Sequence, residues 1–419
     1  MGPCSDDMAF HNRRRGQRGE IWAVTGRTQS PRLAVIVLVL SAGILAAAQV
    51  GKVPPLLPAI RGELALTLVE AGWMTSLTTL TGALFGATFG FLADRLGAAR
   101  MLLAGLALLA GAGLAGAAAV SGSGLAGTRA LESIGLIAVV VAGPRLLYSA
   151  SPQRLHGLTL GLWGCYMPAG MALIMFATPM LHGLGWRDIW LVNAAVLALL
   201  LLTAGIVMRP IRAPAASAAR AAPPLRLRVV LTRPAPWVLA ACFGLYSMQW
   251  FAVAAWLPTY LIESLGHPPA QAARITAAVV AVNVAGNIAG AWLIHRGVAR
   301  ARLVALAYLA MAASAVGIFS GGSGALTPVI AAILFSGLGG ILPAAVMAGA
   351  ARHAPGPAQV GLVTGIIIQG ANLGSLAGPP VTAGAVLLLG GWERLHWPLL
   401  AASTVGLLLA AALARLERR

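Results

Sequence analysis

Charge is scarce in this chain of 419 residues, and acidic residues are the scarcer kind. Only 10% of the residues are charged, with 11 Asp and Glu against 29 Lys and Arg, whereas 59% are hydrophobic. A soluble domain of this size needs far more polar surface, so the composition excludes that class. The length leaves room for about ten to twelve membrane-spanning helices of roughly 20 residues each. The sequence therefore predicts an all-α membrane protein with many spans.

The residues that bind metals or carry out chemistry are also rare. Cys4, Cys165 and Cys242 are far apart, so they indicate neither a disulfide framework nor a metal site. The seven histidines lie in the predicted tails, loops or ends of apolar segments. No segment matches the phosphate-binding pattern Gly-x4-Gly-Lys-Ser/Thr of ATP-driven proteins. We therefore expect no enzyme activity, no cofactor, no metal and no direct use of ATP.

Basic residues are concentrated in alternate loops, which argues against a nucleic-acid surface and encodes topology instead. Both chain ends fall on the arginine-rich side; the other side receives only Lys52, Arg61, Arg187, Arg274 and Arg394. Because basic loops stay in the cytoplasm, this predicts two cytoplasmic termini and an even number of spans. Twelve apolar segments fit, at residues 33–52, 68–92, 100–120, 124–147, 156–181, 187–208, 236–262, 271–294, 302–320, 325–349, 359–387 and 395–414.

Polar stretches divide the chain further. Residues 1–32 are rich in arginine and lack an apolar core, which predicts a disordered cytoplasmic tail and no signal peptide. Residues 209–235 contain five prolines and six arginines, which predicts a cytoplasmic linker whose arginines touch anionic lipid headgroups. The division predicts six-helix bundles at residues 33–208 and 236–414, and a short cytoplasmic tail at 415–419.

The two predicted bundles resemble each other at an offset near 200 residues. Leu57-Pro58-x4-Glu63 corresponds to Leu257-Pro258-x4-Glu263, each after the first span of its bundle. Matching glycines follow at offsets of 200 and 204, in the pairs Gly86/Gly286, Gly90/Gly290, Gly157/Gly361, Gly161/Gly365 and Gly170/Gly374. A constant offset at matching span positions predicts two copies of one six-helix unit.

A charged turn separates the second apolar segment from the third, within Gly90-Phe-Leu-Ala-Asp-Arg-Leu-Gly-Ala-Ala-Arg100. Charges are costly inside lipid, so we expect a short interfacial loop here. Gly90, Leu92, Asp94, Arg95, Gly97 and Arg100 resemble the loop motif of the major facilitator superfamily, which joins its second and third helices. The resemblance implies two bundles with the substrate near the midplane between them. It also implies a conformational latch made by Gly90, Asp94, Arg95, Gly97 and Arg100.

The fourth apolar segment holds the only opposite charges that lie well inside one predicted span, Arg129 and Glu132. An Arg at mid-span costs about 2.5–3.5 kcal/mol on insertion scales, and a spacing of three puts both side chains on one helix face. The pair can be purely structural. Alternatively, Arg129 faces a central cavity, where it binds an anion or biases the protonation of Glu132. The segment resembles the superfamily's fourth-helix pattern, apart from Ser133, where the family often has Gly.

Other polar and aromatic side chains inside the spans are candidates for lining that cavity or for hydrogen bonds between helices. They are Gln49, Tyr166, Tyr246, Gln249, Trp250, Asn283, Gln369 and Asn372. Trp186, Trp392 and Trp397 are expected as anchors at the membrane interface. Prolines inside spans, among them Pro168 and Pro343, are expected to kink their helices.

Together the residues predict a twelve-helix transporter of this superfamily. The fourth-to-sixth region resembles the branch of cyanate and 2-nitroimidazole carriers, through Arg129, Pro144, Pro168, Gly170 and Gly185-Trp186-Arg187. The expected function is secondary transport of a small organic solute, with anions favoured, by a rocker-switch movement. Glu132 would carry the proton of a symporter; if it only pairs with Arg129, the protein is a uniporter or exchanger.

Two alternatives stay open at this point. One is an efflux antiporter of drugs or metabolites, although Gly164-x3-Pro168-x-Gly170 differs from the antiporter signature. The other is a polytopic sensor or membrane enzyme that transports nothing. The expected partners are a small-molecule substrate, a proton and membrane lipids, and no nucleic acid. A monomer in a bacterial inner membrane is the expected setting.

Overall fold

The computed structural model describes residues 32–181, 183–209, 227–320, 326–356 and 359–418, and these are helical with no strand. Ten helices in the described ranges are long and apolar enough to cross a membrane, and the bent pair Gln153–Gly164 and Tyr166–Met180 makes an eleventh span. The second predicted span is present in three consecutive pieces. These spans agree with the twelve predicted segments. Nearly all of the predicted tail and most of the predicted linker lie outside the described residues.

The helices before the linker form the first group, residues 32–209. Its first span is the helix Arg32–Glu63, whose last part is α2 (Val53–Glu63). The others, in chain order, are α3 (Leu68–Ser76), η1 (Leu77–Thr79), α4 (Leu80–Leu96), α5 (Ala98–Ala117), α6 (Gly122–Ala150), η2 (Gln153–Leu155), α7 (His156–Gly164), α8 (Tyr166–Ala177), η3 (Thr178–Met180) and α9 (Trp186–Val207).

The helices after the linker form the second group, residues 227–418. It begins with a short helix at the surface and continues with longer ones. They are α10 (Leu227–Leu231), α11 (Pro234–Glu263), α12 (Pro269–His295), α13 (Arg300–Phe319), α14 (Thr327–Gly339), α15 (Ile341–His353), α16 (Val360–Leu389), η6 (Trp392–Leu395) and α17 (His396–Arg418).

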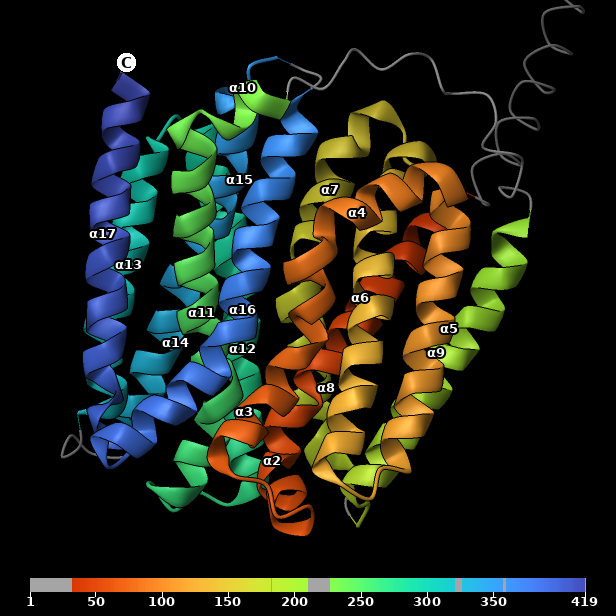
Figure 1. Cartoon of the computed structure of the whole chain (residues 1–419), viewed down its shortest axis with the longest axis vertical. Coiled ribbons are helices and arrows are strands. Elements are labelled where there is room, and N and C mark those ends of the chain that lie inside the picture. Colours follow the sequence, from red (N-terminus) through yellow and green to blue (C-terminus); the bar gives the residue numbers. More distant parts are fainter. Residues whose placement is uncertain (1–31, 182, 210–226, 321–325, 357–358, 419) are drawn as a thin grey trace, which may run out of the picture.

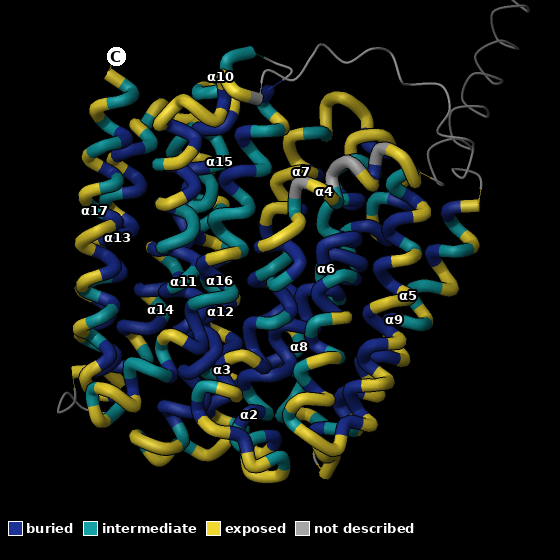
Figure 2. The backbone as a smooth tube through the Cα atoms, viewed as in Figure 1, coloured by how far each residue is buried: buried dark blue, intermediate teal, exposed yellow. Residues whose placement is uncertain are grey.

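The two groups stand side by side with their long helices nearly parallel (Figure 1). We call the end where α10 and the C-terminus lie the linker end, and the opposite end, with α2 and α3, the α2 end. Buried residues follow the inner faces of the helices, and exposed ones cover the outer faces and the two ends (Figure 2). Apolar outer faces suit a protein whose solvent is lipid.

Two predicted boundaries on the first group are wrong. The first helix runs past residue 52 to Glu63, because Pro54 and Pro55 stand at the start of α2, where a helix does not need their missing N–H groups. The predicted loop from Gly90 to Arg100 is also mostly helix. Only Gly97, with φ of 84°, lies between α4 and α5, because glycine adopts this conformation without strain.

Two predicted kinks coincide with breaks in the helices. The fifth span bends by 49° between α7 and α8 at Cys165, three residues before Pro168. The tenth span is interrupted between α14 and α15 at Gly340, three residues before Pro343. A proline inside a helix leaves the carbonyl four residues earlier without its donor, which favours a break at this distance.

The internal repeat appears as equal helix crossings in the two groups. A Cβ added to Gly170 of α8 would collide with the backbone oxygen of Ile44, and one added to Gly374 of α16 with that of Gly244. Both crossings therefore require glycine for close backbone approach. A second pair of contacts joins the second span to the fourth in each group: Ser133 bonds Thr81 in the first group, and Asn283 bonds the Ser336 oxygen in the second.

The seam between the groups is closed at the α2 end. A Cβ on Gly72 of α3 would lie 2.8 Å from Pro380 Cα, and one on Gly82 of α4 would lie 2.8 Å from Asn372 Nδ2. Toward the linker end, Gly86 of α4, one turn from Gly82, and Gly365 of α16, two turns from Asn372, have open space around an added Cβ. Along these two helices the groups therefore touch toward the α2 end and part toward the linker end.

Candidate functional site

A buried charge cluster lies inside the first group, on the fourth predicted span. Arg129 and Glu132 occupy consecutive turns of α6, and both side chains are fully buried. The Arg129 guanidinium donates to a Glu132 carboxylate oxygen, as their spacing of three allows. It also donates from Nε to the Met74 oxygen at 3.0 Å and from Nη1 to the Gln49 oxygen at 2.8 Å. These contacts tie α6 to the first and second spans.

Lys52 is the second cation of this cluster, and its assignment to an outer loop is wrong. It lies within the helix Arg32–Glu63 and is fully buried. Its Nζ donates to Glu132 Oε1 at 2.7 Å and to Gln49 Oε1 at 2.8 Å. It also stands 4.2 Å from the centre of the Trp190 ring, a distance suited to a cation–π contact. The Glu132 carboxylate and the Trp190 ring offset part of the free-energy cost of burying the positive charge of Lys52.

The sixth span supplies the remaining residues of the cluster. Asn193 of α9 accepts a hydrogen bond of 2.7 Å from Gln49 Nε2, so Gln49 links Lys52 to α9. Six buried side-chain atoms of the described residues lack a hydrogen-bond partner, and three of them are donors on residues of this cluster: Arg129 Nη2, Trp190 Nε1 and Asn193 Nδ2. With all three ionisable groups charged, the cluster carries one positive charge in excess. Its unpartnered donors match the needs of an anion rather than a cation.

The predicted polar residues of the second group form a neutral network. Asn283 Nδ2 donates to Tyr246 Oη at 2.9 Å and to the Ser336 oxygen at 2.8 Å. Trp250 Nε1 donates to Ser336 Oγ at 2.9 Å. Gln249 accepts a bond of 2.9 Å from Ser403 Oγ. These residues are buried and join α11, α12, α14 and α17, as expected of hydrogen bonds between helices.

The remaining cavity candidates lie at or near the seam. Gln369 Nε2 of α16 donates to the Ala83 oxygen of α4 at 3.0 Å, so it joins the two groups directly. Asn372, nearly one turn away, faces Gly82. Both are half-buried. Tyr166 is also half-buried and stacks on Trp163, with ring centres 5.1 Å apart.

The latch candidates stand at the linker end of α4 and the start of α5. Arg95 and Arg100 are exposed, and Gly97 makes the turn between the helices. The side chain of Asp94 and the environment of Gly90 lie outside the described part of the structure. The latch therefore stays a prediction.

A second set of charges lies at the α2 end. Glu63 accepts from Trp186 Nε1 at 2.6 Å and pairs with Arg187, both from its own group. Glu263, its counterpart in the repeat, accepts from Trp392 Nε1 at 3.2 Å but pairs at 3.3 Å with Arg61 of the first group. This ion pair crosses the seam at its closed end.

The tryptophans expected at the membrane interface divide into two kinds. Trp186 and Trp392 are buried and hold the two glutamates, so they join helices instead of anchoring the chain in lipid. Trp397 is 63% exposed, as an interface anchor would be.

Sequence reasoning missed Lys52, Trp190 and Asn193. The predicted first span ends at residue 52, whereas the helix continues through α2, with Pro54 and Pro55 in its first turn. One signal was available: Lys52 is the only lysine of the chain, and it follows Gln49 by three residues, which places both on one face.

This arrangement has counterparts among known proteins. Residues 39–339 match the Major Facilitator Superfamily. The chain belongs to this superfamily. It is similar to the probable nitrate/nitrite transporter NarK2 of Mycobacterium tuberculosis, with 31% identity over 370 residues that cover 86% of this chain and 88% of that protein. It is also similar to the cyanate transport protein CynX of Escherichia coli, with 26% identity over 360 residues, 85% of this chain and 91% of that protein.

Solved structures share the fold. One is a bacterial homolog to the human lysosomal transporter Spinster in an inward-facing and unoccupied conformation, with a TM-score of 0.73 and 15% identity over 92% of this chain and 94% of that one. The predicted superfamily and its branch near the cyanate carriers are confirmed. This superfamily member is a multi-pass membrane protein and a secondary transporter of a small molecule, and it is not an enzyme.

Proposed function

We propose that this transporter carries a small monovalent anion by alternating access, and that Arg129, Lys52 and Glu132 form its charged centre. One observation carries the proposal: the cluster holds an excess positive charge in a fully buried place, with an Arg129 N–H left unpartnered. Uncompensated charge inside a membrane protein is costly, and intramembrane ionisable groups mark substrate and ion pathways. An anion would neutralise the excess.

The relatives support an anion as the substrate. Their printed names include nitrate, nitrite and cyanate, each of which carries one negative charge and is small. The arginine is suited to such ligands because its planar guanidinium presents paired donors to two oxygens. In this state the cluster is fully enclosed, so the cycle must open a path to it when the groups move.

The same cluster gives a physical route to proton coupling. Both oxygens of Glu132 accept bonds from cations, Arg129 and Lys52. A proton on Glu132 would add a second uncompensated positive charge and favour the anion. Because linkage is reciprocal, the anion would favour the proton equally. The expected mode is proton–anion symport, with uniport as the outcome if Glu132 never takes up a proton.

The conformation supports an inward-facing state of this cycle. The arginine-rich loops favour a cytoplasmic position for the linker end and both termini, in a bacterial inner membrane. The seam parts toward this end, and the Arg61–Glu263 pair and the Gly72 contact close the other. The two groups would rock about these contacts as the two halves of a monomeric transporter. In the outward-facing state, Asp94, Arg95 and Arg100 would hold the linker end closed.

Uptake into proteoliposomes tests the proposal. Purified protein is reconstituted with and without an inward proton gradient and offered labelled nitrate, nitrite or cyanate. We expect saturable uptake of at least one anion, faster with the gradient, and competition among the anions. Glu132→Gln should bind the anion but lose the gradient effect.

The controls separate the two parts of the proposal. Gradient dependence that survives Glu132→Gln would remove the proton role and leave anion transport standing. Uptake that is equal for a neutral analogue such as urea, or absent for every anion offered, would overturn the anion itself.

A further inference from the structure

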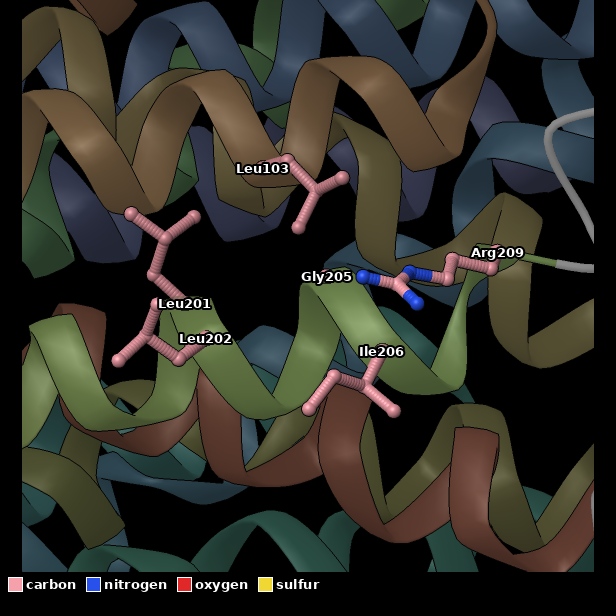
Figure 3. Close-up of a pocket in the computed structure, with 6 residues that line it drawn as sticks. All are labelled: Leu103, Leu201, Leu202, Gly205, Ile206 and Arg209. Atoms are coloured by element: carbon pink, nitrogen blue, oxygen red, sulfur yellow. The ribbon is translucent and has the colours of Figure 1, made fainter.

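A groove on the outer surface of the first group lies between α5 and α9 (Figure 3), on the side away from the second group (Figure 1). It holds about 430 Å³, within the range of small-molecule sites, and is lined by Leu103, Leu201, Leu202, Gly205, Ile206 and Arg209. Apart from Arg209, every lining residue is apolar or glycine. The groove therefore suits a hydrocarbon chain with a charge at one end.

The floor of the groove exists because residue 205 is glycine. A Cβ added there meets nothing within 4 Å, so the space above the α9 backbone is open. Leu201, Gly205 and Arg209 follow each other at intervals of four, so they line one face of the helix. Leu202 and Ile206 are 66% and 63% exposed beside it, which leaves the groove open toward the lipid.

Arg209 supplies the charge. It ends the sixth span at the linker end, and its side chain points back along the groove toward Gly205 (Figure 3). It forms no ion pair with any residue of the described ranges. The linker that follows cannot provide one, because residues 209–235 contain six arginines and no Asp or Glu. Neither the described residues nor the linker therefore offer Arg209 a counter-ion, and its guanidinium is open to an anion at the membrane surface.

A second cation stands near the same end of the groove. Arg100 is exposed on α5, one turn nearer the linker end than Leu103. Two arginines above an apolar groove match the phosphate and acyl chain of a lipid. Anionic lipid at a cytoplasmic surface attracts such residues by about 1 kcal/mol for each cation.

We propose that this groove is a binding site for one anionic glycerophospholipid, with an acyl chain along Leu201, Gly205 and Ile206 and the phosphate at Arg209. The proposal does not depend on the transported substrate. The ligand class follows from the two parts of the site: the apolar walls exclude a free phosphate as the sole ligand, and the arginine selects a charged headgroup over a neutral one.

Thermal unfolding of the full-length protein in detergent tests this site. The protein is titrated with dioleoylphosphatidylglycerol, with dioleoylphosphatidylcholine and with inorganic phosphate. We expect saturable stabilisation by phosphatidylglycerol alone. Arg209→Gln should weaken its apparent affinity about fivefold, the factor that corresponds to about 1 kcal/mol for one cation.

Two further variants fix the place of binding. Gly205→Phe fills the groove and should also weaken the affinity, whereas Arg418→Gln removes an equally exposed arginine at the linker end of the other group and should leave it unchanged. Equal stabilisation by phosphatidylcholine or by phosphate would overturn the proposal. So would phosphatidylglycerol affinities that are the same in Arg209→Gln, Gly205→Phe and the unaltered protein.

Discussion

The two groups of helices share a scaffold but differ in buried charge. In each group a polar contact joins the second span of the bundle to the fourth, through Thr81 and Ser133 in the first group and through Asn283 and Ser336 in the second. An offset of 200 brings Lys52 onto Ala252, and an offset of 203 brings Arg129 and Glu132 onto Ala332 and Phe335. The second group therefore builds this part of the fold without any charge. The comparison teaches that the architecture does not require charges at these positions, which agrees with the transport role proposed for those of the first group.

The groups also differ at the α2 end. Glu63 and Glu263 are equivalent, and each accepts a bond from the tryptophan of its own group. Arg187 pairs with Glu63, but its counterpart Arg394 bonds the Leu389 oxygen instead. Glu263 is thereby left to pair with Arg61 across the seam. Arg187 bonds both Glu63 and the Ala119 oxygen, so the groups differ in whether the glutamate pairs within its own group or across the seam.

The largest effect is expected from breaking the charge cluster. Glu132→Ala leaves Lys52 and Arg129 buried without a counter-charge and should cost about 3–5 kcal/mol in the free energy of unfolding. A control change in the neutral network of the second group, Gln249→Ala, removes an uncharged hydrogen bond and should cost about 1 kcal/mol. Denaturation of both purified variants in mixed detergent measures the difference.

A triple variant sharpens the same comparison. Lys52→Ala with Arg129→Ala and Glu132→Phe copies the residues of the second group, so it should recover most of the stability but abolish anion uptake. Uptake that persists in the triple variant would contradict a role for the cluster in transport.

The next effect concerns the glycine crossings that the groups have in common. Gly170→Ala and Gly374→Ala each force a methyl group against a backbone carbonyl and should cost about 1–3 kcal/mol or more. Gly161→Ala and Gly365→Ala are matched controls in open space and should be neutral or stabilise by about 0.5–1 kcal/mol. If only one of the two crossings is sensitive to alanine, the crossings are not equivalent.

A smaller effect is expected from Arg129→Lys, which keeps the charge. Lysine cannot bond Glu132 and the backbone oxygens of Met74 and Gln49 together, so the KM for the anion should rise about tenfold, or about 1.4 kcal/mol. Ser336→Ala in the neutral network should change this KM less than twofold. Anion uptake kinetics in proteoliposomes check both values, and an unchanged KM in Arg129→Lys would argue against planar recognition.

The smallest effect is expected at the α2 end, where the ion pair is partly exposed. Glu263→Gln should weaken the closed seam by about 0.2–1 kcal/mol, and Glu63→Gln, whose pair lies within one group, should not. Spin labels on cysteines at the exposed positions Gly62 and Ser264 report the distance between the groups. A longer mean distance in Glu63→Gln than in Glu263→Gln would reverse this assignment. High salt should reduce the difference between the two variants.

Most of the fold could be predicted from periodicity, but the partners of the site could not. The apolar segments, the repeat and the breaks near Pro168 and Pro343 follow from local composition and backbone chemistry. The pairing of Arg129 with Glu132 follows from their spacing on one helix. Lys52 lies 80 residues away in the chain from Glu132, and prolines beside it imitate a loop, so no local pattern joins them.

The sequence by itself determined the class of protein, because a chain with so few charges can bury its apolar surface only in lipid, and the repeat required two similar bundles. The tertiary structure alone decided which buried polar groups meet. Hydrogen bonds and ion pairs act over a few ångströms between helices that are distant in the chain, so the choice of Lys52 as the partner of Glu132, and of Arg61 as the partner of Glu263, depends on how the helices are placed.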